Sequence, residues 1–180
     1  VGSRERVVLL EIGEHWLVVG VAPGSVTGIA TLPRGELAGP CVDDHDGKKA
    51  APDFELPDLN GSQVRLSAYR GNRPVLLYFW ATWCPSCLAA KPEIAKLRDK
   101  IGRDSMEILG INVGNGDTLD RLKRYQQGHP VPWPVLFDAA GKVTRSYRVQ
   151  GIPHFVLVDT EGNMVYWGNS LPADPKKYLK

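Results

Sequence analysis

The sequence predicts an α/β domain with a mixed central sheet, preceded by a small N-terminal β appendage. Three observations lead to this prediction. Between residues 63 and 147, strand-like apolar runs alternate with helical patterns, as in a sheet that has helices packed against it. Two further strand-like runs then flank the turn at residues 160–163, which indicates an antiparallel pair. The first 38 residues contain only short apolar or β-branched runs separated by turn residues.

Length and composition fit this architecture and exclude some functions. The chain has 180 residues, 43% hydrophobic and 23% charged, which suffices for one well-packed domain and an appendage. The formal net charge is +2 and no run of Lys and Arg exceeds two, so no nucleic acid or anionic membrane partner is indicated. No apolar stretch approaches the roughly 20 residues of a transmembrane helix, and no signal peptide is visible. Because the sequence begins at Val1, we interpret it as a form from which an upstream signal or anchor can have been lost.

Residues 1–38 are predicted to form the small β segment. Residues 39–50 are rich in Gly, Asp and Lys, which is typical of a linker, and residues 51–180 form the α/β domain. The N-terminal strand candidates are three apolar or β-branched runs: Arg6–Ile12, Trp16–Val21 and Val26–Leu32.

The first half of the α/β domain contains its most strongly patterned elements. Gln63–Leu66 is a short strand candidate. Pro74–Ala81 is a continuous apolar run, as expected of a strand that is covered on both faces. From Cys84 to about Ile101, apolar residues recur at spacings of three and four, which indicates a helix.

The second half continues the alternation and ends in the antiparallel pair. Pro172–Lys180 then supplies only about two helical turns, so we expect one face of the sheet to be less well covered. The predicted elements are a buried strand, a polar-faced helix, a strand, a short helix and two antiparallel strands: Met106–Val113, Thr118–Gln127, Val135–Asp138, Lys142–Tyr147, His154–Asp159 and Met164–Trp167.

The sequence Cys84-Pro85-Ser86-Cys87 lies where a predicted buried strand gives way to a helix. The first N–H groups of a helix lack intrahelical partners and carry partial positive charge, so they stabilise a thiolate on Cys84. In comparable sites the thiol pKa falls from about 8.5 toward 7 or lower. Pro85 suits the first helical turn because it lacks only an N–H that would be unpaired there. Cys87, one turn later, can attack a mixed disulfide on Cys84, so Cys84 is the attacking thiol and Cys87 the resolving one.

Other readings of this pair were weighed. No second C-x-x-C or H-x-x-x-H completes a zinc site. Haem attachment requires His after the second cysteine, where this chain has Leu88. A purely structural disulfide stays open, although the strand-to-helix context favours redox function. The third cysteine, Cys41, falls in the linker and is interpreted as an incidental thiol rather than a regulatory partner.

Several motifs in residues 51–180 extend well beyond the two cysteines. They are Ala51-Pro52-Asp53-Phe54, the run Phe79-Trp80-Ala81-Thr82-Trp83 before Cys84, Pro92, Gly151-Ile152-Pro153, and Val158-Asp159 with Gly162. With them, this region resembles the thioredoxin superfamily. It is most similar to the TlpA/ResA-like (AhpC/TSA-redoxin) branch of extracytoplasmic, often membrane-tethered disulfide reductases.

The resemblance implies a thioredoxin-like three-layer sandwich that exchanges disulfides with protein substrates, more as a reductase than as an oxidase. It implies a cis-Pro153 opposite the cysteine pair, with the backbone of Ile152 pairing with an extended substrate segment. Trp83 and Pro85 complete the expected substrate-binding set, Trp83 by covering the sulfurs and offering apolar contact. We expect an upstream thiol reductant, no metal, no organic cofactor besides the Cys84–Cys87 disulfide, a monomer, and a periplasmic role in redox homeostasis and electron transport.

The chain departs from its relatives around Cys87. Thioredoxins carry a buried Asp where this chain has Tyr78, and TlpA/ResA-type relatives often carry a Glu where it has Ala90. Either acid would take the proton from the resolving thiol as a general base. Water, the Tyr78 hydroxyl and Lys91 remain as candidate acceptors, and we expect slow resolution.

Two aromatic residues near the cysteine pair, Trp80 and His154, are interpreted as packing residues rather than as participants in the reaction. Trp80 is expected to belong to the core. His154 follows Pro153 at the start of a strand, and we interpret it as a packed, hydrogen-bonded histidine rather than a proton shuttle.

Two rival activities were considered. A thiol peroxidase of the redoxin type shares the fold, but its P-x-x-x-T-x-x-C pattern fails at Leu77 and Ala81. A haem-handling reductase of cytochrome c maturation usually carries acidic residues in the cis-proline loop, and Gly151–Phe155 has none.

A further rival concerns Arg4–Pro33, which resembles the soluble part of the flagellar export protein FliO through the runs at residues 5–13 and 17–24. This resemblance implies a redox-fold docking module fused to a flagellar-export-like segment. It also implies a cytoplasmic face, in conflict with the periplasmic location of TlpA-like reductases. We give the longer resemblance precedence for function, and the cytoplasm stays open as a location.

Overall fold

The computed structural model describes residues 6–12, 15–22, 25–33, 49–102 and 104–178. The chain divides into two compact units, residues 1–42 and residues 43–180. Most of the predicted linker, together with Cys41, lies outside the described residues.

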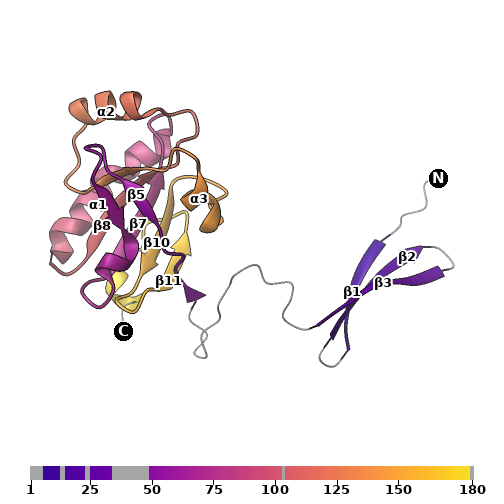
Figure 1. Ribbon diagram of the computed structural model, residues 1–180. Coiled ribbons are helices and arrows are strands. Elements are labelled where there is room, and N and C mark those ends of the chain that lie inside the picture. The colour runs from indigo at the N-terminus through magenta and orange to yellow at the C-terminus, as the bar shows by residue number, and fades with distance from the viewer. Residues whose placement is uncertain (1–5, 13–14, 23–24, 34–48, 103, 179–180) are drawn as a thin grey trace. The chain divides into compact units, whose positions relative to one another are not determined.

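The N-terminal unit contains a three-stranded antiparallel sheet in the order β1-β2-β3 (Figure 1). Its strands are β1 (Arg6–Ile12), β2 (His15–Ala22) and β3 (Ser25–Pro33). The three strands predicted from apolar and β-branched runs are confirmed, and β2 and β3 each extend one residue further at both ends.

A six-stranded sheet in the order β4-β11-β10-β7-β8-β9 forms the centre of the second unit. The neighbours β7, β8 and β9 run parallel, whereas the pairs of β10 with β7, β11 with β10 and β4 with β11 are antiparallel. The predicted mixed sheet is therefore confirmed. Its strands are β4 (Lys49–Ala50), β7 (Val75–Trp80), β8 (Glu107–Asn112), β9 (Val135–Phe137), β10 (His154–Val158) and β11 (Asn163–Gly168).

Helices pack on both faces of this sheet and give three layers. On one face of β7, the Tyr78 hydroxyl bonds to α1 at Cys87, and the Trp80 ring lies 5.8 Å from that of Tyr125 in α2. On the opposite face, Phe79 packs against the residue that follows α3. The helices are α1 (Pro85–Ile101), α2 (Leu119–Gly128) and α3 (Lys142–Ser146).

The sequence explains why β7 and α1 form where they do. Every residue of β7 is buried, as the continuous apolar run predicts for a strand covered on both faces. α1 begins with Pro85 at its first position and retains Pro92 inside. Gly102 ends it with a φ of 88°, a left-handed conformation that favours glycine.

Five short elements, with β4 among them, differ from the sequence-based expectations. Leu66 does not extend β6 but begins a 3₁₀ turn with its side chain buried, and the chain ends in a second 3₁₀ turn rather than two α-helical turns. Lys49–Ala50, assigned to the linker, form β4 at the sheet edge. β5 was not predicted because Glu and Pro, which occupy two of its three positions, are depleted in strands. The elements concerned are β5 (Glu55–Pro57), β6 (Gln63–Arg65), η1 (Leu66–Tyr69) and η2 (Pro175–Tyr178).

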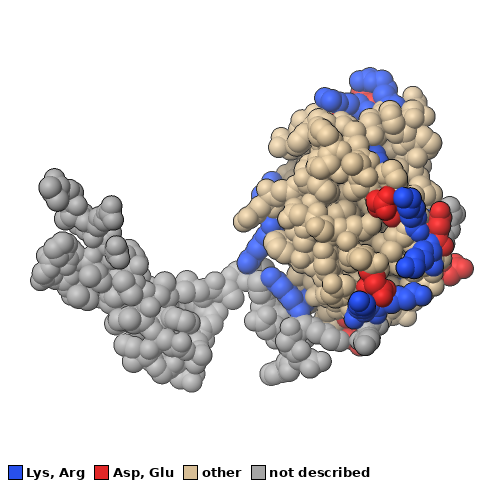
Figure 2. Space-filling model, turned by 180° about the vertical axis from the view of Figure 1, so that it is seen from behind, with Lys and Arg blue, Asp and Glu red and all other residues tan. Residues whose placement is uncertain are grey.

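The surface of the second unit carries charges of both signs. On the face seen in Figure 2, acidic and basic side chains lie next to one another at one side of a broad uncharged area. This mixture agrees with the small formal net charge of the chain, +2.

Candidate active site

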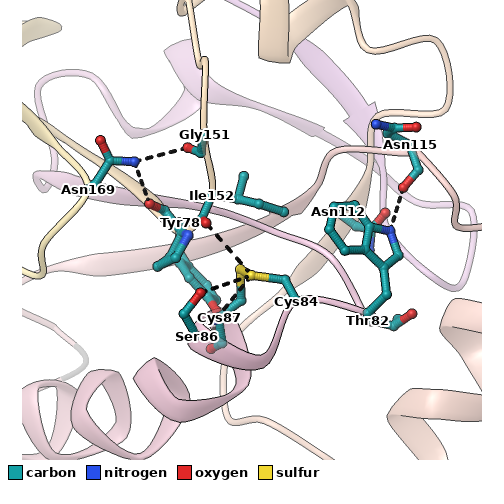
Figure 3. Close-up of a disulfide and its surroundings, with 12 residues drawn as sticks. Tyr78, Thr82, Cys84, Ser86, Cys87, Asn112, Asn115, Gly151, Ile152 and Asn169 are labelled. Carbon is teal, nitrogen blue, oxygen red and sulfur yellow. Dashed lines mark hydrogen bonds between the residues drawn. A yellow bond between two sulfur atoms is a disulfide. The ribbon is translucent and has the colours of Figure 1, made fainter.

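Cys84 occupies the N-cap of α1 and Cys87 lies in its first turn. The two cysteines form a disulfide, with their Cα atoms 5.2 Å apart (Figure 3). The Cys87 N–H points at Cys84 Sγ across 3.2 Å, so the sulfur is the cap that the unpaired N–H groups of the helix require. Both cysteines are buried, with 4% of Cys84 and 0% of Cys87 accessible. The local geometry favours negative charge on Cys84 when the disulfide opens.

A cis-proline loop faces this disulfide. The Ile152–Pro153 peptide bond is cis, as the resemblance implied. Cys84 Sγ lies 3.8 Å from the carbonyl oxygen of Ile152. The Asn169 side chain, just after β11, donates to Gly151 O at 3.1 Å and to Pro153 O at 2.9 Å. One amide group therefore holds the carbonyls on either side of Ile152 (Figure 3).

Tyr78 approaches the cysteine pair from β7, beneath α1. Its hydroxyl donates a hydrogen bond of 2.6 Å to the backbone oxygen of Cys87. Burial raises the pKa of this phenol well above its ordinary value, because the low-dielectric core disfavours the phenolate. Tyr78 therefore holds the first turn of α1 as a donor, and the structure does not support it as a proton acceptor.

Lys91 lies one turn beyond Cys87 and packs against aromatic rings. Its Nζ is 3.7 Å from the ring centroid of Trp80 and 4.5 Å from that of Tyr125, whose hydroxyl lies 3.5 Å away. Burial lowers the pKa of Lys91 to about 8. A part of its population is therefore neutral at mildly alkaline pH, and the rings stabilise the remaining ammonium.

Trp83 and Trp80 have contrasting surroundings. Trp80 is 1% accessible and belongs to the core, as expected. Trp83 is 46% accessible, and its indole N–H donates to Asn115 O at 2.6 Å. A Cβ at Gly116 would lie 3.0 Å from that indole nitrogen, so the loop passes close along the ring. Trp83 thus presents an apolar surface next to Cys84 while its polar edge is fixed.

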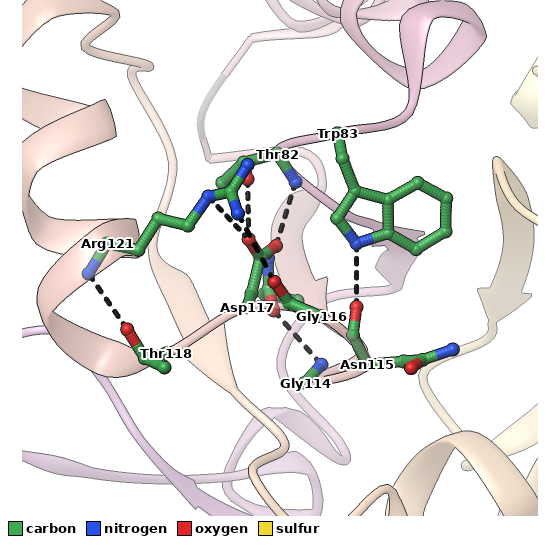
Figure 4. A network of polar contacts seen from close by, with 9 residues as sticks. Thr82, Trp83, Gly114, Asn115, Gly116, Asp117, Thr118 and Arg121 are labelled. Carbon is green, nitrogen blue, oxygen red and sulfur yellow. Dashed lines mark hydrogen bonds and ion pairs between the residues drawn. The ribbon is translucent and has the colours of Figure 1, made fainter.

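A polar network that was not predicted from the sequence lies at this end of the sheet. Asp117, between β8 and α2, accepts hydrogen bonds from Thr82 and Asn112 and pairs with Arg121 (Figure 4). Polar residues follow both β7 and β8 in the sequence. Because these strands are parallel neighbours, their carboxyl ends meet at one edge of the sheet, and this pattern could have indicated the network.

His154 is packed, as interpreted from its position, but its buried Nε2 has no hydrogen-bond partner among the described residues. It is 1% accessible and its ring makes edge contacts with Phe79 and Trp167, at centroid distances of 6.3 Å and 4.5 Å. Burial lowers the pKa of His154, and a hydrogen bond with Asn169 partly opposes this shift. The buried ring packs behind Pro153, at the start of β10.

The described residues contain no cluster of three or more His, Cys, Asp and Glu side chains that is placed to hold a metal ion. None of the helices in the described part of the chain has the length and apolar character that a membrane span requires.

The fold and the cysteine geometry together define the class of protein. A C-x-x-C disulfide at the start of a helix, facing a cis-proline loop on a thioredoxin-like sheet, is the arrangement of a thiol-disulfide oxidoreductase. Sequence comparison gives the family. The model of the AhpC/TSA family matches residues 48–167, and the chain belongs to this family. The model of the flagellar biosynthesis protein FliO matches residues 1–55.

Individual relatives agree with this assignment. The thiol-disulfide oxidoreductase ResA of Geobacillus kaustophilus is 32% identical over 132 residues, which cover 72% of this chain and 74% of the relative. Among solved structures, a protein of Chlorobium tepidum assigned as the thiol:disulfide interchange protein DsbE superposes with a TM-score of 0.62 at 27% identity, over 73% and 89% of the two chains. An exposed lipoprotein thioredoxin of Streptococcus pneumoniae gives 0.60 at 31% identity, over 67% and 91%. The expected resemblance to ResA-like proteins is confirmed.

Proposed function

We propose that this oxidoreductase works as a reductase of protein disulfides, with Cys84 as the attacking thiol and Cys87 as the resolving thiol. The observation that supports these roles is the N-cap position of Cys84, whose sulfur accepts the Cys87 N–H while it faces the cis-proline loop. The helix start stabilises a thiolate there, and a thiolate is the attacking species in disulfide exchange.

The proposed cycle conserves sulfur bonds and electrons. The Cys84 thiolate attacks one sulfur of the substrate disulfide, and the other substrate sulfur leaves as a thiolate. Cys87, after losing its proton, attacks Cys84 Sγ and releases the second substrate thiolate. The substrate gains two electrons and the protein ends with the Cys84–Cys87 disulfide. An upstream dithiol reductant then restores the reduced pair.

We assign substrate docking to Trp83, Pro85, Ile152 and Pro153. Trp83 offers an exposed apolar ring, and Ile152 and Pro153 are partly accessible beside the disulfide. Asn169 already occupies the carbonyls of Gly151 and Pro153, so an extended substrate segment would pair with Ile152.

Single-cysteine variants test the proposed roles. C84S should abolish insulin reduction, whereas C87S should accumulate a mixed disulfide with the substrate protein. C41S is the matched control and should retain wild-type activity. Insulin reduction by C84S would contradict the assignment. Cys84-dependent consumption of peroxide would instead favour the thiol peroxidase alternative.

The direction of exchange is tested by the Cys84–Cys87 reduction potential, measured against glutathione. Characterised C-x-x-C proteins range from about −270 to about −120 mV. We expect a value near the reducing end. A value near the oxidising end would overturn the reductase proposal and leave the oxidoreductase class intact.

We also propose that the protein acts as a monomer outside the cytoplasm, tethered through a segment beyond the present sequence. The similarity to an exposed lipoprotein thioredoxin supports this location, and the FliO match supports a tether. Cell fractionation of the tagged full-length protein tests the location, and recovery with the cytoplasmic fraction would contradict it.

A further inference from the structure

A buried carboxylate, that of Asp117, lies at the polar edge where β7 and β8 end. The Asp117 side chain is completely inaccessible to solvent. Its Oδ2 accepts from Thr82 N at 2.8 Å and from Asn112 Nδ2 at 2.7 Å. Its Oδ1 accepts from Thr82 Oγ1 at 2.5 Å and lies 3.5 Å from Arg121 Nε (Figure 4). Three hydrogen bonds and one ion pair therefore hold the carboxylate.

This arrangement fits an anchor. A buried charge costs several kcal/mol unless it is paired and hydrogen-bonded, and here the donors supply that compensation. Because the carboxylate is bonded to Thr82, Asn112 and Arg121, it fastens these residues to one another.

The anchored residues are those that lead into the active-site helix. Thr82 is fixed through both its backbone N–H and its hydroxyl, two residues before Cys84. The next residue, Trp83, bonds to Asn115 O in the same loop that contains Asp117. Asn112 completes the connection, since its Oδ1 accepts from Gly114 N at 3.0 Å while its amide donates to Asp117.

Gly116 shows how closely this loop follows Trp83. Its φ is +74°, a conformation that side chains rarely adopt, and a Cβ there would lie 3.0 Å from the indole nitrogen. The loop at residues 114–118 therefore lies in close contact with the Trp83 indole. Asp117 connects this loop to the backbone of the active-site turn at Thr82.

We propose that Asp117 is a positioning residue that acts through Thr82 and the loop 114–118 to fix the Trp83 docking surface and the Cys84 sulfur at the start of α1. The proposal rests on the roles assigned above to Cys84 and Trp83. Misplacement of a reacting group by about 1 Å can cost about 100-fold in rate, so release of this anchor should affect chemistry as well as stability.

The test compares variants of both partners. In D117N, only one side-chain oxygen remains to accept the hydrogen bonds that the two carboxylate oxygens accept in the wild-type protein. This variant should lower kcat/KM for a protein disulfide at least about tenfold. T82V removes the hydroxyl donor without changing charge and should cause a smaller loss in the same direction. T82S keeps both donors and should behave as wild type. K123A, at an exposed position of α2 outside this network, is the matched control and should leave the activity unchanged.

Two readouts separate positioning from a merely structural role. The first is the pH profile of Cys84 alkylation in the reduced protein, whose midpoint should rise in T82V and not in T82S. The second is the Trp fluorescence change between disulfide and dithiol forms, assigned to Trp83 through W83F, which should diminish in D117N. Wild-type values of both readouts in folded D117N would overturn the proposal.

The matched Thr82 pair decides the outcome if D117N does not fold. Identical alkylation profiles of T82V and T82S would then refute the proposal. A wild-type protein without Cys84-dependent reduction would refute the proposed function, and the alkylation profiles would still report whether the anchor positions Cys84.

Discussion

The two cysteines of the active-site turn lie in contrasting surroundings. Before Cys84, the chain is fastened by a polar network centred on the buried carboxylate of Asp117. Beneath Cys87, the turn rests on aromatic rings of β7 and β10, where Tyr78 stacks on Phe155 at 5.3 Å and donates to Cys87 O. One side is built from charge and hydrogen bonds, the other from stacked rings and one phenol.

The attack by Cys84 and the resolution by Cys87 therefore depend on different interactions. The carboxylate near Cys84 is saturated by donors, so it orders the backbone for attack. Near Cys87, the two positions at which the resemblance led us to expect a carboxylate hold Tyr78 and Ala90. The turn is therefore organised for attack by Cys84 and has no carboxylate at either position to deprotonate Cys87.

The strongest way to break this contrast is to place an acid near Cys87. A90E should accelerate breakdown of the mixed disulfide by at least about tenfold, because positioned general bases contribute about 10² to 10⁴. Single-turnover decay of the mixed disulfide measures this rate. A90Q is the control of equal size. Equal rates for A90E and A90Q would show that deprotonation of Cys87 does not limit resolution.

Removing the hydroxyl of Tyr78 tests the aromatic surroundings of Cys87 without changing the Asp117 network. Y78F deletes the bond to Cys87 O and should lower the free energy of unfolding by about 1 kcal/mol, the net value of a typical hydrogen bond. The matched control is Y166F, which removes an exposed bond of the same length, 2.6 Å, to Ser170 O and should cost less. Denaturant titration of both variants measures the difference. An equal or greater loss in Y166F would contradict this ranking.

Lys91 allows the aromatic side to be examined by pH. Its pKa is about 8 in the folded protein and 10.5 in the unfolded chain. Between these values the unfolded state binds more protons, so stability should rise with pH through this window. The ring contacts reduce the size of this rise because they stabilise the ammonium.

The measurement compares wild type with K91M by denaturant titration at pH 7.5 and pH 10. Relative to K91M, the wild-type protein should gain stability at the higher pH. Parallel pH dependence of the two proteins would mean that Lys91 does not titrate in this window.

The smallest effect is expected from the N-terminal unit. Deletion of residues 1–42 should leave insulin reduction unchanged, because both sides of the turn belong to the second unit. Deletion of residues 1–50 should preserve activity but lower the melting temperature, since it removes the pairing of β4 with β11. Loss of activity in the shorter deletion would show that the N-terminal unit contributes to the reaction.

Much of the fold and part of the site could be predicted from local sequence. The apolar run that became β7 and the spacing that became α1 are strong patterns, because they span full elements. The short elements β5 and η1 escaped prediction, because Glu and Pro in β5 are depleted in strands and Leu66 of η1 fits a strand as well as a turn. Pro175–Tyr178 showed a related limit, because a stretch expected to supply about two helical turns gave a four-residue 3₁₀ turn.

The candidate site divides in the same way. The cysteine pair, its place at a helix start and the role of Trp80 in the core follow from neighbouring residues. Tyr78 illustrates the limit, because sequence left it open as a proton acceptor and the structure makes it a donor to Cys87 O. The direction of a hydrogen bond depends on which group lies opposite.

By itself, the sequence determined the strand-to-helix placement of Cys84 and Cys87, since apolar periodicity and the first-turn proline act over a few residues. Resemblance to a family added the cis-Pro153. Only the tertiary structure brought Asp117 to Thr82, 35 residues away, and Asn169 to the carbonyls beside Ile152. These contacts depend on which strands are neighbours in the sheet, and strand order arises from the packing of the whole domain rather than from any local pattern.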